Sequence, residues 1–238
     1  MRSGRALAQL MLLSAHRDPN PNTMITQNVI KALCAEGYHK LAALTRAAAP
    51  ATSAEGEEGE EKKKRGRKKE ANEVKLDEDS ADIKETRLSV RGAQYTLQAL
   101  AEVFSAQLFQ SLTRLWELLV TPLKSALTSA KISNDLDQQL IDALHVLSAV
   151  IGHVDRALWG AITELMKMMI QLIPKLSTET RELNAVALAH ICHVLGVEAM
   201  KIVLDQLVPL LQHQTHVEAR LGAAVALHSK CACLIWQI

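Results

Sequence analysis

Aromatic residues, glycine and proline are scarce in this sequence, and their scarcity limits the fold class. Phe, Trp and Tyr together make up 3% of the 238 residues, and there are only 10 glycines and 6 prolines. Sheet proteins use aromatic and β-branched residues in strands and need many turns, whereas Leu and Ala, which are abundant here, favour helices. The composition therefore predicts an all-α fold.

Charge of one sign, cysteines and long apolar runs are also lacking. The 27 basic and 26 acidic residues give a net charge of +1, so no overall field attracts the chain to nucleic acid or membranes. The four cysteines are too few and too unevenly spaced for a disulfide framework, which favours a reducing compartment. The first 15 residues imitate a short signal peptide, but Gln9 interrupts the apolar run and the same residues form an amphipathic helix. No apolar segment approaches the roughly 18 to 20 residues of a membrane span, so we expect no membrane partner.

One segment, residues 46–87, differs in composition from the rest of the chain. It contains an acidic block, the basic block 62–69 and a second acidic block, with few apolar side chains. Such a segment cannot offset its own ordering entropy, which predicts a disordered insertion. Two functions remain open for it: a solvated linker, or a basic run, KKKRGRKK, that acts as a nuclear import signal or contacts phosphates.

Apolar residues recur with a helical period on both sides of this insertion. Ser133 or Asn134, and Ser177 or Thr178, can cap helices, and Gly196 is typical of a helix end. Two apolar stripes follow the insertion. The first consists of Leu88, Tyr95, Leu97, Leu100, Val103 and Phe104, and the second of Leu108, Leu112, Leu115, Trp116, Leu119 and Val120. We predict helices at about 3–15, 22–36, 88–104, 134–150, 155–173, 177–195, 197–212 and 217–230.

Taken in pairs, these helices repeat. The second helix of each pair begins near residue 88, 134, 177 or 215, a period of about 38 to 46 residues that is typical of HEAT and armadillo arrays. Arg181, followed by V-A-L at 186–188, recurs as Arg220, followed by V-A-L at 225–227. We therefore predict a HEAT/armadillo-like helical-repeat solenoid, divided into residues 1–45, a disordered charged insertion at 46–87, and residues 88–238. Both ends are expected to have been cut from a longer array.

Motifs that carry chemistry are hard to find. There is no glycine-rich phosphate loop and no nucleophile turn, and the histidines and cysteines lack the second ligand pair of a zinc site. Arg181 and Arg220, each one step after a turn, are interpreted as structural links between neighbouring repeats. We expect a chain that is not an enzyme and that holds no cofactor or metal.

Residues 88–123 carry a family resemblance. An R-G-A helix with Arg91, Gly92 and Ala93 precedes an L-W helix with Leu115 and Trp116 that ends in P-L at 122–123. This order resembles the HEAT-repeat arm of the TATA-binding-protein-associated factors of the Swi2/Snf2 class, and the similarity extends over roughly residues 88–227. Two departures are Ser105, where the family tends to have Gly, and Thr113, where it tends to have Pro.

The resemblance implies a partner and a location. In that family the arm grips the TATA-binding protein, and a Swi2/Snf2 ATPase domain that follows the arm removes this protein from promoter DNA. The chain is therefore expected to be nuclear and to bind the TATA-binding protein. Its other expected partners are the ATPase domain of the full-length protein and promoter DNA, which it would meet only indirectly through the complex. The alternative is a generic HEAT scaffold or transport adaptor for an unrelated protein. The turns within repeats line one edge of a solenoid and are the expected contact sites. Their polar residues are Lys131, Asn134, Asp135, Lys175, Glu179, His213 and His216.

Overall fold

The computed structural model describes residues 2–18, 20–48, 81–212 and 217–235, and within these ranges every regular element is helical. The prediction of an all-α fold is confirmed. No helix in the described ranges is long and apolar enough to cross a membrane. The elements are α1 (Arg2–Ser14), α2 (Asn22–Leu33), the π-helix η1 (Cys34–His39), α3 (Lys40–Ala48), α4 (Ala81–Phe104), η2 (Ser105–Gln107), α5 (Leu108–Ser111), α6 (Thr113–Thr128), α7 (Asn134–Val150), η3 (Ile151–His153), η4 (Arg156–Leu158), α8 (Trp159–Leu172), η5 (Ile173–Lys175), α9 (Thr178–Leu195), α10 (Val197–Leu211) and α11 (Val217–Ile235).

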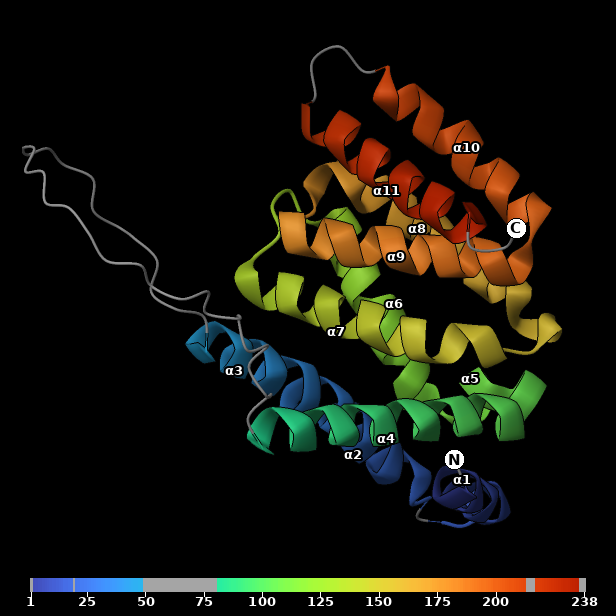
Figure 1. Ribbon diagram of the computed structural model, residues 1–238. Helices are drawn as coiled ribbons and strands as arrows, with labels where there is room; N and C mark the ends of the chain where they lie inside the picture. The colour runs from blue at the N-terminus through green and yellow to red at the C-terminus, as the bar shows by residue number, and fades with distance from the viewer. Residues whose placement is uncertain (1, 19, 49–80, 213–216, 236–238) are drawn as a thin grey trace, which may run out of the picture.

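The helices stack as pairs in two layers (Figure 1). The first helix of each pair is α2, α6, α8 or α10, and it packs on its second helix, which is α4, α7, α9 or α11. Second helices contact one another in the order α1, α4, α7, α9, α11, and first helices do so in the order α2, α6, α8, α10. A continuous apolar core, from Ala8 to Ala226, fills the space between the layers. This is the architecture of a helical-repeat solenoid.

Local capping signals set several helix boundaries. The Ser133 hydroxyl accepts the backbone N–H of Leu136 at 3.3 Å, and the Ser177 hydroxyl accepts that of Thr180 at 3.3 Å, so the two serines cap α7 and α9. Gly196 ends α9 with φ at 77°, a left-handed conformation that suits glycine. The predicted stops and starts at these positions are confirmed.

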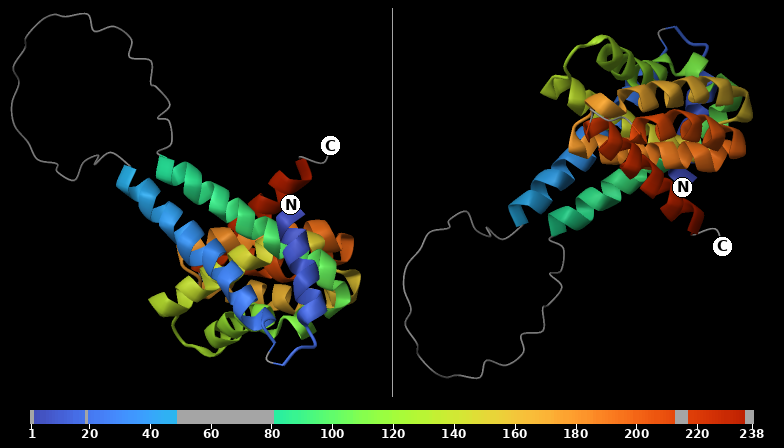
Figure 2. Two further views of the ribbon diagram at one scale, coloured as in Figure 1. Left: turned by 90° about the horizontal axis from the view of Figure 1, so that it is seen from below. Right: turned by 90° about the horizontal axis from the view of Figure 1, so that it is seen from above.

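The helices next to the predicted insertion are longer than expected. The helix predicted at 22–36 continues through η1 into α3 and ends at Ala48, and its partner α4 begins at Ala81 instead of residue 88. Both edges of the predicted 46–87 insertion are therefore helical, and its remaining residues, 49–80, lie outside the described residues. The two long helices run side by side and project beyond the rest of the stack (Figure 2).

Two further predictions about α4 and α6 were wrong in part. Of the stripe predicted on α4, Leu97, Leu100 and Phe104 are buried, but Leu88 is 67% exposed and Tyr95 is also exposed, because Val90 and Ala93 complete the buried face instead. The L-W helix does not end at Pro122: α6 continues to Thr128, with Pro122, Leu123 and Ala126 buried. Burial of its last turns outweighs the loss of one backbone hydrogen bond at the proline.

Candidate protein-binding edge

Helices α7, α9 and α11 all begin on the same side of the stack, which forms one edge of the molecule (Figure 1). The turn between α6 and α7 exposes Lys131, and the first turn of α7 exposes Asn134 and Asp135. The next turn along the edge carries Lys175 and Glu179, which are both exposed. The last two predicted contact residues, His213 and His216, lie outside the described residues. We call the exposed residues of these turns and first helical turns the turn edge.

Lys175 joins two neighbouring turns. Its ammonium donates to the carbonyl oxygens of Leu127 at 3.0 Å and Ser129 at 2.9 Å, with Ala126 at 3.4 Å. These are unpaired acceptors at the C-terminal end of α6, where the helix dipole is negative. Lys175 therefore stabilises the α6 terminus, so a change at this residue would disturb the fold as well as any partner contact.

Side-chain hydrogen bonds connect successive second helices at their starts. The Thr180 hydroxyl donates to Asp137 Oδ1 at 2.7 Å, which links α9 to α7. Arg181 Nη2 donates to Glu218 Oε2 at 2.6 Å and to the Leu176 carbonyl at 3.0 Å, which links α9 to α11. The interpretation of Arg181 as a link between repeats is confirmed, whereas Arg220 is exposed. These links hold the turn edge in one rigid arrangement.

The first helical turns give the turn edge acidic groups at repeated positions. Asp135, Glu179 and Glu218 are exposed at the starts of α7, α9 and α11. Carboxylates are favoured there because they face the positive end of each helix dipole. Sequence reasoning missed Glu218, although its place two residues after His216 and its equivalence to Glu179 could have indicated it.

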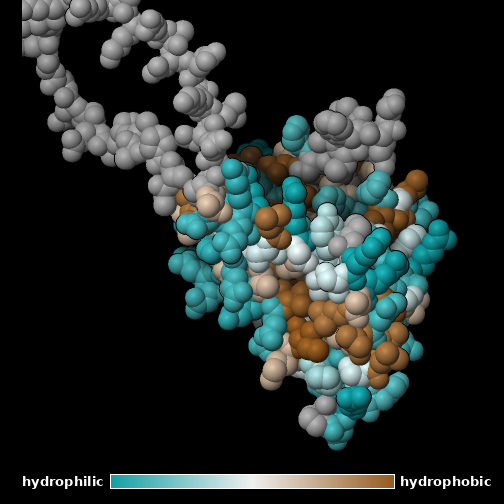
Figure 3. All heavy atoms as spheres, turned by 60° about the horizontal axis from the view of Figure 1, so that its bottom comes forward, coloured by the Kyte–Doolittle hydropathy of each residue, from teal (hydrophilic) through white to brown (hydrophobic). Residues whose placement is uncertain are grey.

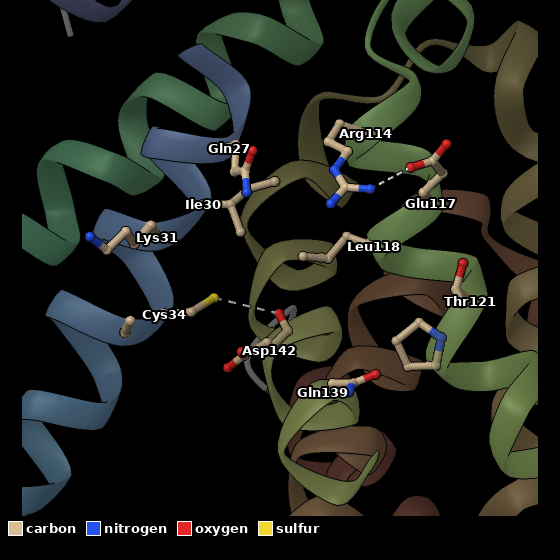
Figure 4. Close-up of a pocket in the computed structure, with 12 residues that line it drawn as sticks. Gln27, Ile30, Lys31, Cys34, Arg114, Glu117, Leu118, Thr121, Gln139 and Asp142 are labelled. Atoms are coloured by element: carbon tan, nitrogen blue, oxygen red, sulfur yellow. Dashed lines mark hydrogen bonds and ion pairs between the residues drawn. The ribbon is translucent and has the colours of Figure 1, made fainter. Parts of the chain in front are cut away.

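A groove opens between α2 and α6, with α7 beneath it (Figure 4). Its volume is about 420 Å³, and apolar side chains such as Ile30 and Leu118 line it together with polar groups at its rim. Two of the rim cations already have acidic neighbours: Arg114 Nη1 lies 2.9 Å from Glu117 Oε2, and Lys31 Nζ lies 3.3 Å from Glu36 Oε1. No sequence pattern predicts this groove, because it depends on how two helix pairs pack.

A group of side chains of the π-helix η1 contacts α7. Tyr38 stacks on His145 with ring centroids 3.7 Å apart, and His39 Nε2 lies 2.7 Å from Asp142 Oδ1. Cys34 Sγ contacts the Asp142 carbonyl at 3.8 Å. These contacts join residues about a hundred positions apart, so no local pattern could predict them.

Burial keeps two members of this group uncharged at neutral pH. Burial, reinforced by the charge of Asp142, raises the pKa of the Cys34 thiol to about 12, so the reactive thiolate does not form. Burial also lowers the pKa of His145 to about 4, against the opposing influence of Asp142 and with a small added effect of His39. The group therefore fixes the packing of η1 on α7 and has no activated nucleophile. In the described ranges, no three His, Cys, Asp or Glu side chains are grouped so that they could hold a metal ion.

Taken together, the fold and the turn edge define a helical-repeat protein with a rigid polar edge. Comparison with known proteins finds a family model and several relatives that match part of the chain. Residues 1–118 match the family model DUF3535, described as a domain of unknown function. The "TATA-binding protein-associated factor mot1" of Aspergillus fumigatus (strain CBS 144.89 / FGSC A1163 / CEA10) is 27% identical over 154 residues, which cover 62% of this chain and 8% of that protein. The protein of the same name from Schizosaccharomyces pombe is 25% identical over 171 residues, which cover 63% of this chain and 9% of that protein.

The chain is a homologue of the TATA-binding protein-associated factors of the mot1 type. It spans less than a tenth of the length of the curated relatives that it matches. The family resemblance predicted from the sequence is therefore confirmed.

Proposed function

We propose that this chain is a non-catalytic HEAT-repeat region that binds the TATA-binding protein through its turn edge. The observation that supports the proposal is its homology to proteins named TATA-binding protein-associated factor, together with a rigid stack that presents successive polar turns. Because the turns are already ordered, several weak contacts can add with little loss of conformational entropy.

The charge of the turn edge suits a DNA-binding partner. Proteins that bind DNA carry basic surfaces that contact phosphates, and exposed carboxylates can pair with such surfaces. Asp135 and Glu179 supply these carboxylates at the starts of α7 and α9, whereas Glu218 at the start of α11 is already paired with Arg181. Lys131 adds a positive group that can select an acidic residue on the partner.

The proposal includes the wider role implied by the family resemblance. The chain would act in the nucleus and would meet promoter DNA only through the TATA-binding protein. It would support removal of that protein by a Swi2/Snf2 ATPase domain that is not in this sequence. The basic run 62–69 would supply nuclear import, and it lies outside the described residues.

Isothermal titration calorimetry of the full 238-residue chain with the TATA-binding protein of the same organism tests the proposal. We expect saturable binding at about 50 mM salt that weakens at about 300 mM salt, because exposed charge pairs are screened. No heat of binding at about 50 µM protein and low salt would contradict the proposal and favour the generic scaffold. Binding that does not change with salt would place the contact on an apolar surface away from the turn edge.

A further inference from the structure

Helix α4 carries a row of cations on the face that points away from the core. Lys84, Arg87 and Arg91 are exposed there, together with Leu88 and Tyr95, which are 67% and 40% exposed. Their spacing of i, i+3, i+4, i+7 and i+11 places the five side chains along one side of about three helical turns. We call these five residues the α4 stripe. Among the described residues, neither Lys84 nor Arg91 has an ion-pair partner or a side-chain hydrogen bond.

The α4 stripe does not lie at an end of the stack. In the row of second helices, α4 lies between α1 and α7 and packs against both (Figure 1). Repeats of a solenoid contact their neighbours along the stack, so a further repeat beside α1 or α11 would leave the outward face of α4 open. Figure 3 shows mainly hydrophilic surface toward the left of the view, where α3 and the start of α4 project.

The opposite side of α4 is fixed by packing, so a rigid helix presents the stripe. Val90 and Leu97 are buried in the core. Helix η1 packs so closely on α4 that a Cβ atom added at Gly37 would lie 2.7 Å from Val90 Cγ2. Gln94 Nε2 also donates to the Tyr38 hydroxyl of η1 at 2.7 Å. A partner therefore binds this face with little further ordering of α4.

The composition of the α4 stripe favours a protein partner over nucleic acid. Leu88 stands among the cations, and a phosphate backbone offers no apolar surface that could bury it. Asp82 and Glu85 are exposed on the adjoining side of the helix and would repel the closely spaced phosphates of a duplex. A helix with carboxylates and leucines at matching spacing can pair with the cations and cover Leu88 and Tyr95 at the same time.

We propose that the α4 stripe binds an acidic amphipathic helix of a partner protein. Carboxylates of that helix pair with Lys84, Arg87 and Arg91, and its apolar side chains cover Leu88 and Tyr95. The row from Lys84 to Arg91 is about 10 Å long, which corresponds to about two turns of the bound helix. This site is separate from the turn edge, and the inference does not rest on binding of the TATA-binding protein.

Fluorescence anisotropy with the full 238-residue chain tests the proposal. The probe is a labelled helical peptide of about 16 residues that carries Glu and Leu along one face and Ala and Gln elsewhere. The control peptide has the same composition in scrambled order. We expect the amphipathic peptide to bind with a Kd of about 10 to 100 µM at low salt, and the scrambled peptide to bind about tenfold more weakly or worse.

Two variants and a matched control locate the contact. Lys84→Glu/Arg91→Glu should lose about tenfold or more in affinity for the peptide, and Leu88→Ser should lose about threefold to tenfold. The control Lys124→Glu/Lys201→Glu reverses two exposed lysines on first helices α6 and α10 and should stay within about twofold of the wild type. All the substituted residues are exposed, so the melting temperatures should stay close to that of the wild type.

Several outcomes would overturn the proposal. Absence of peptide binding at about 500 µM, or equal binding of the scrambled peptide, would show that the stripe does not recognise an amphipathic helix. Unchanged affinity in the Lys84/Arg91 variant would place the contact elsewhere. A duplex of about 20 base pairs that binds the wild type more tightly than the peptide, with no loss in Leu88→Ser, would assign the stripe to nucleic acid instead.

Discussion

The buried guanidinium of Arg181, at the start of α9, pairs with Glu218 at the start of α11 and holds the two second helices together. Gly222 makes this close packing possible, because a Cβ at that position would lie 3.1 Å from Arg181 Cδ and would collide with Ile173. A single residue without a side chain thus lets α11 approach the arginine that binds it. The two interactions order the C-terminal part of the turn edge.

Removing the guanidinium should destabilise the stack. Arg181→Met leaves the buried Leu176 carbonyl without its donor, which costs about 1 to 2 kcal/mol in free energy of unfolding. The matched change Arg220→Met, at the exposed position equivalent to Arg181, should stay within about 0.5 kcal/mol of the wild type. Urea denaturation followed by circular dichroism measures both. Equal losses in the two variants would show that the Arg181 link is unimportant.

Two glycine-to-alanine changes inside helices should have opposite effects. Gly222→Ala should lower the free energy of unfolding by about 1 to 3 kcal/mol, since the new methyl group overpacks the contact between α11, Ile173 and Arg181. Gly92→Ala adds a methyl group in open space and should raise the free energy of unfolding by about 0.5 to 1 kcal/mol. The same denaturation measurement at low micromolar protein compares them. A stabilising Gly222→Ala would mean that α11 packs less closely than described.

At position 105, replacement of serine by glycine should reduce stability less than replacement by alanine. Ser105 has φ at 46°, a left-handed conformation that costs a non-glycine residue about 1 kcal/mol, and its hydroxyl donates to Asp155 Oδ2. Ser105→Ala keeps the conformational cost and loses the hydrogen bond, so it should destabilise by about 1 kcal/mol. Ser105→Gly loses the same bond but removes the cost, so it should stay near wild-type stability. Thermal unfolding of the two variants checks the order, and an alanine variant as stable as the glycine variant would contradict it.

Stability should fall as pH decreases from about 6.5 to about 4, with His145 as one cause. The pKa of His145 is about 4 in the folded chain, whereas its ordinary value is 6.5. The unfolded state therefore binds more protons within this window, and this binding stabilises the unfolded state increasingly as pH falls. His145→Gln should flatten the pH dependence of the free energy of unfolding, whereas His16→Gln, at an exposed histidine, should leave the slope unchanged. Denaturation series at several pH values measure the slopes. Identical slopes in wild type and His145→Gln would exclude this role.

Local signals predicted much of the stack, and contacts distant in sequence determined the rest. The caps at Ser133 and Ser177 and the stop at Gly196 follow from residue types that act on their own neighbours. Helical periodicity could not show that Leu88 and Tyr95 face solvent, because the buried side of α4 is chosen by its packing on α1, α2 and α7. The group around His39 and Asp142 joins two helix pairs and left no trace in either segment.

The two departures from the family pattern gain a physical meaning in the structure. Ser105 occupies a left-handed turn where glycine is the usual residue, and its hydrogen bond to Asp155 offsets the conformational cost. Thr113 is the first residue of α6, a position where proline is favoured because its missing N–H would be unpaired in any case. For the predicted contact residues, the structure assigns Lys175 a structural task, while Lys131, Asn134, Asp135 and Glu179 stay predictions.

Charge reversal on the turn edge tests the central claim most directly. Calorimetry with the TATA-binding protein should compare the wild type with Asp135→Lys/Glu179→Lys and with a matched control, Glu117→Lys/Glu164→Lys, which changes two exposed glutamates on first helices α6 and α8. If the turn edge binds this partner, the edge variant loses about tenfold or more in affinity at low salt, and the control stays within about twofold. Equal affinity of the wild type and the edge variant, or a larger loss in the control, would contradict the account.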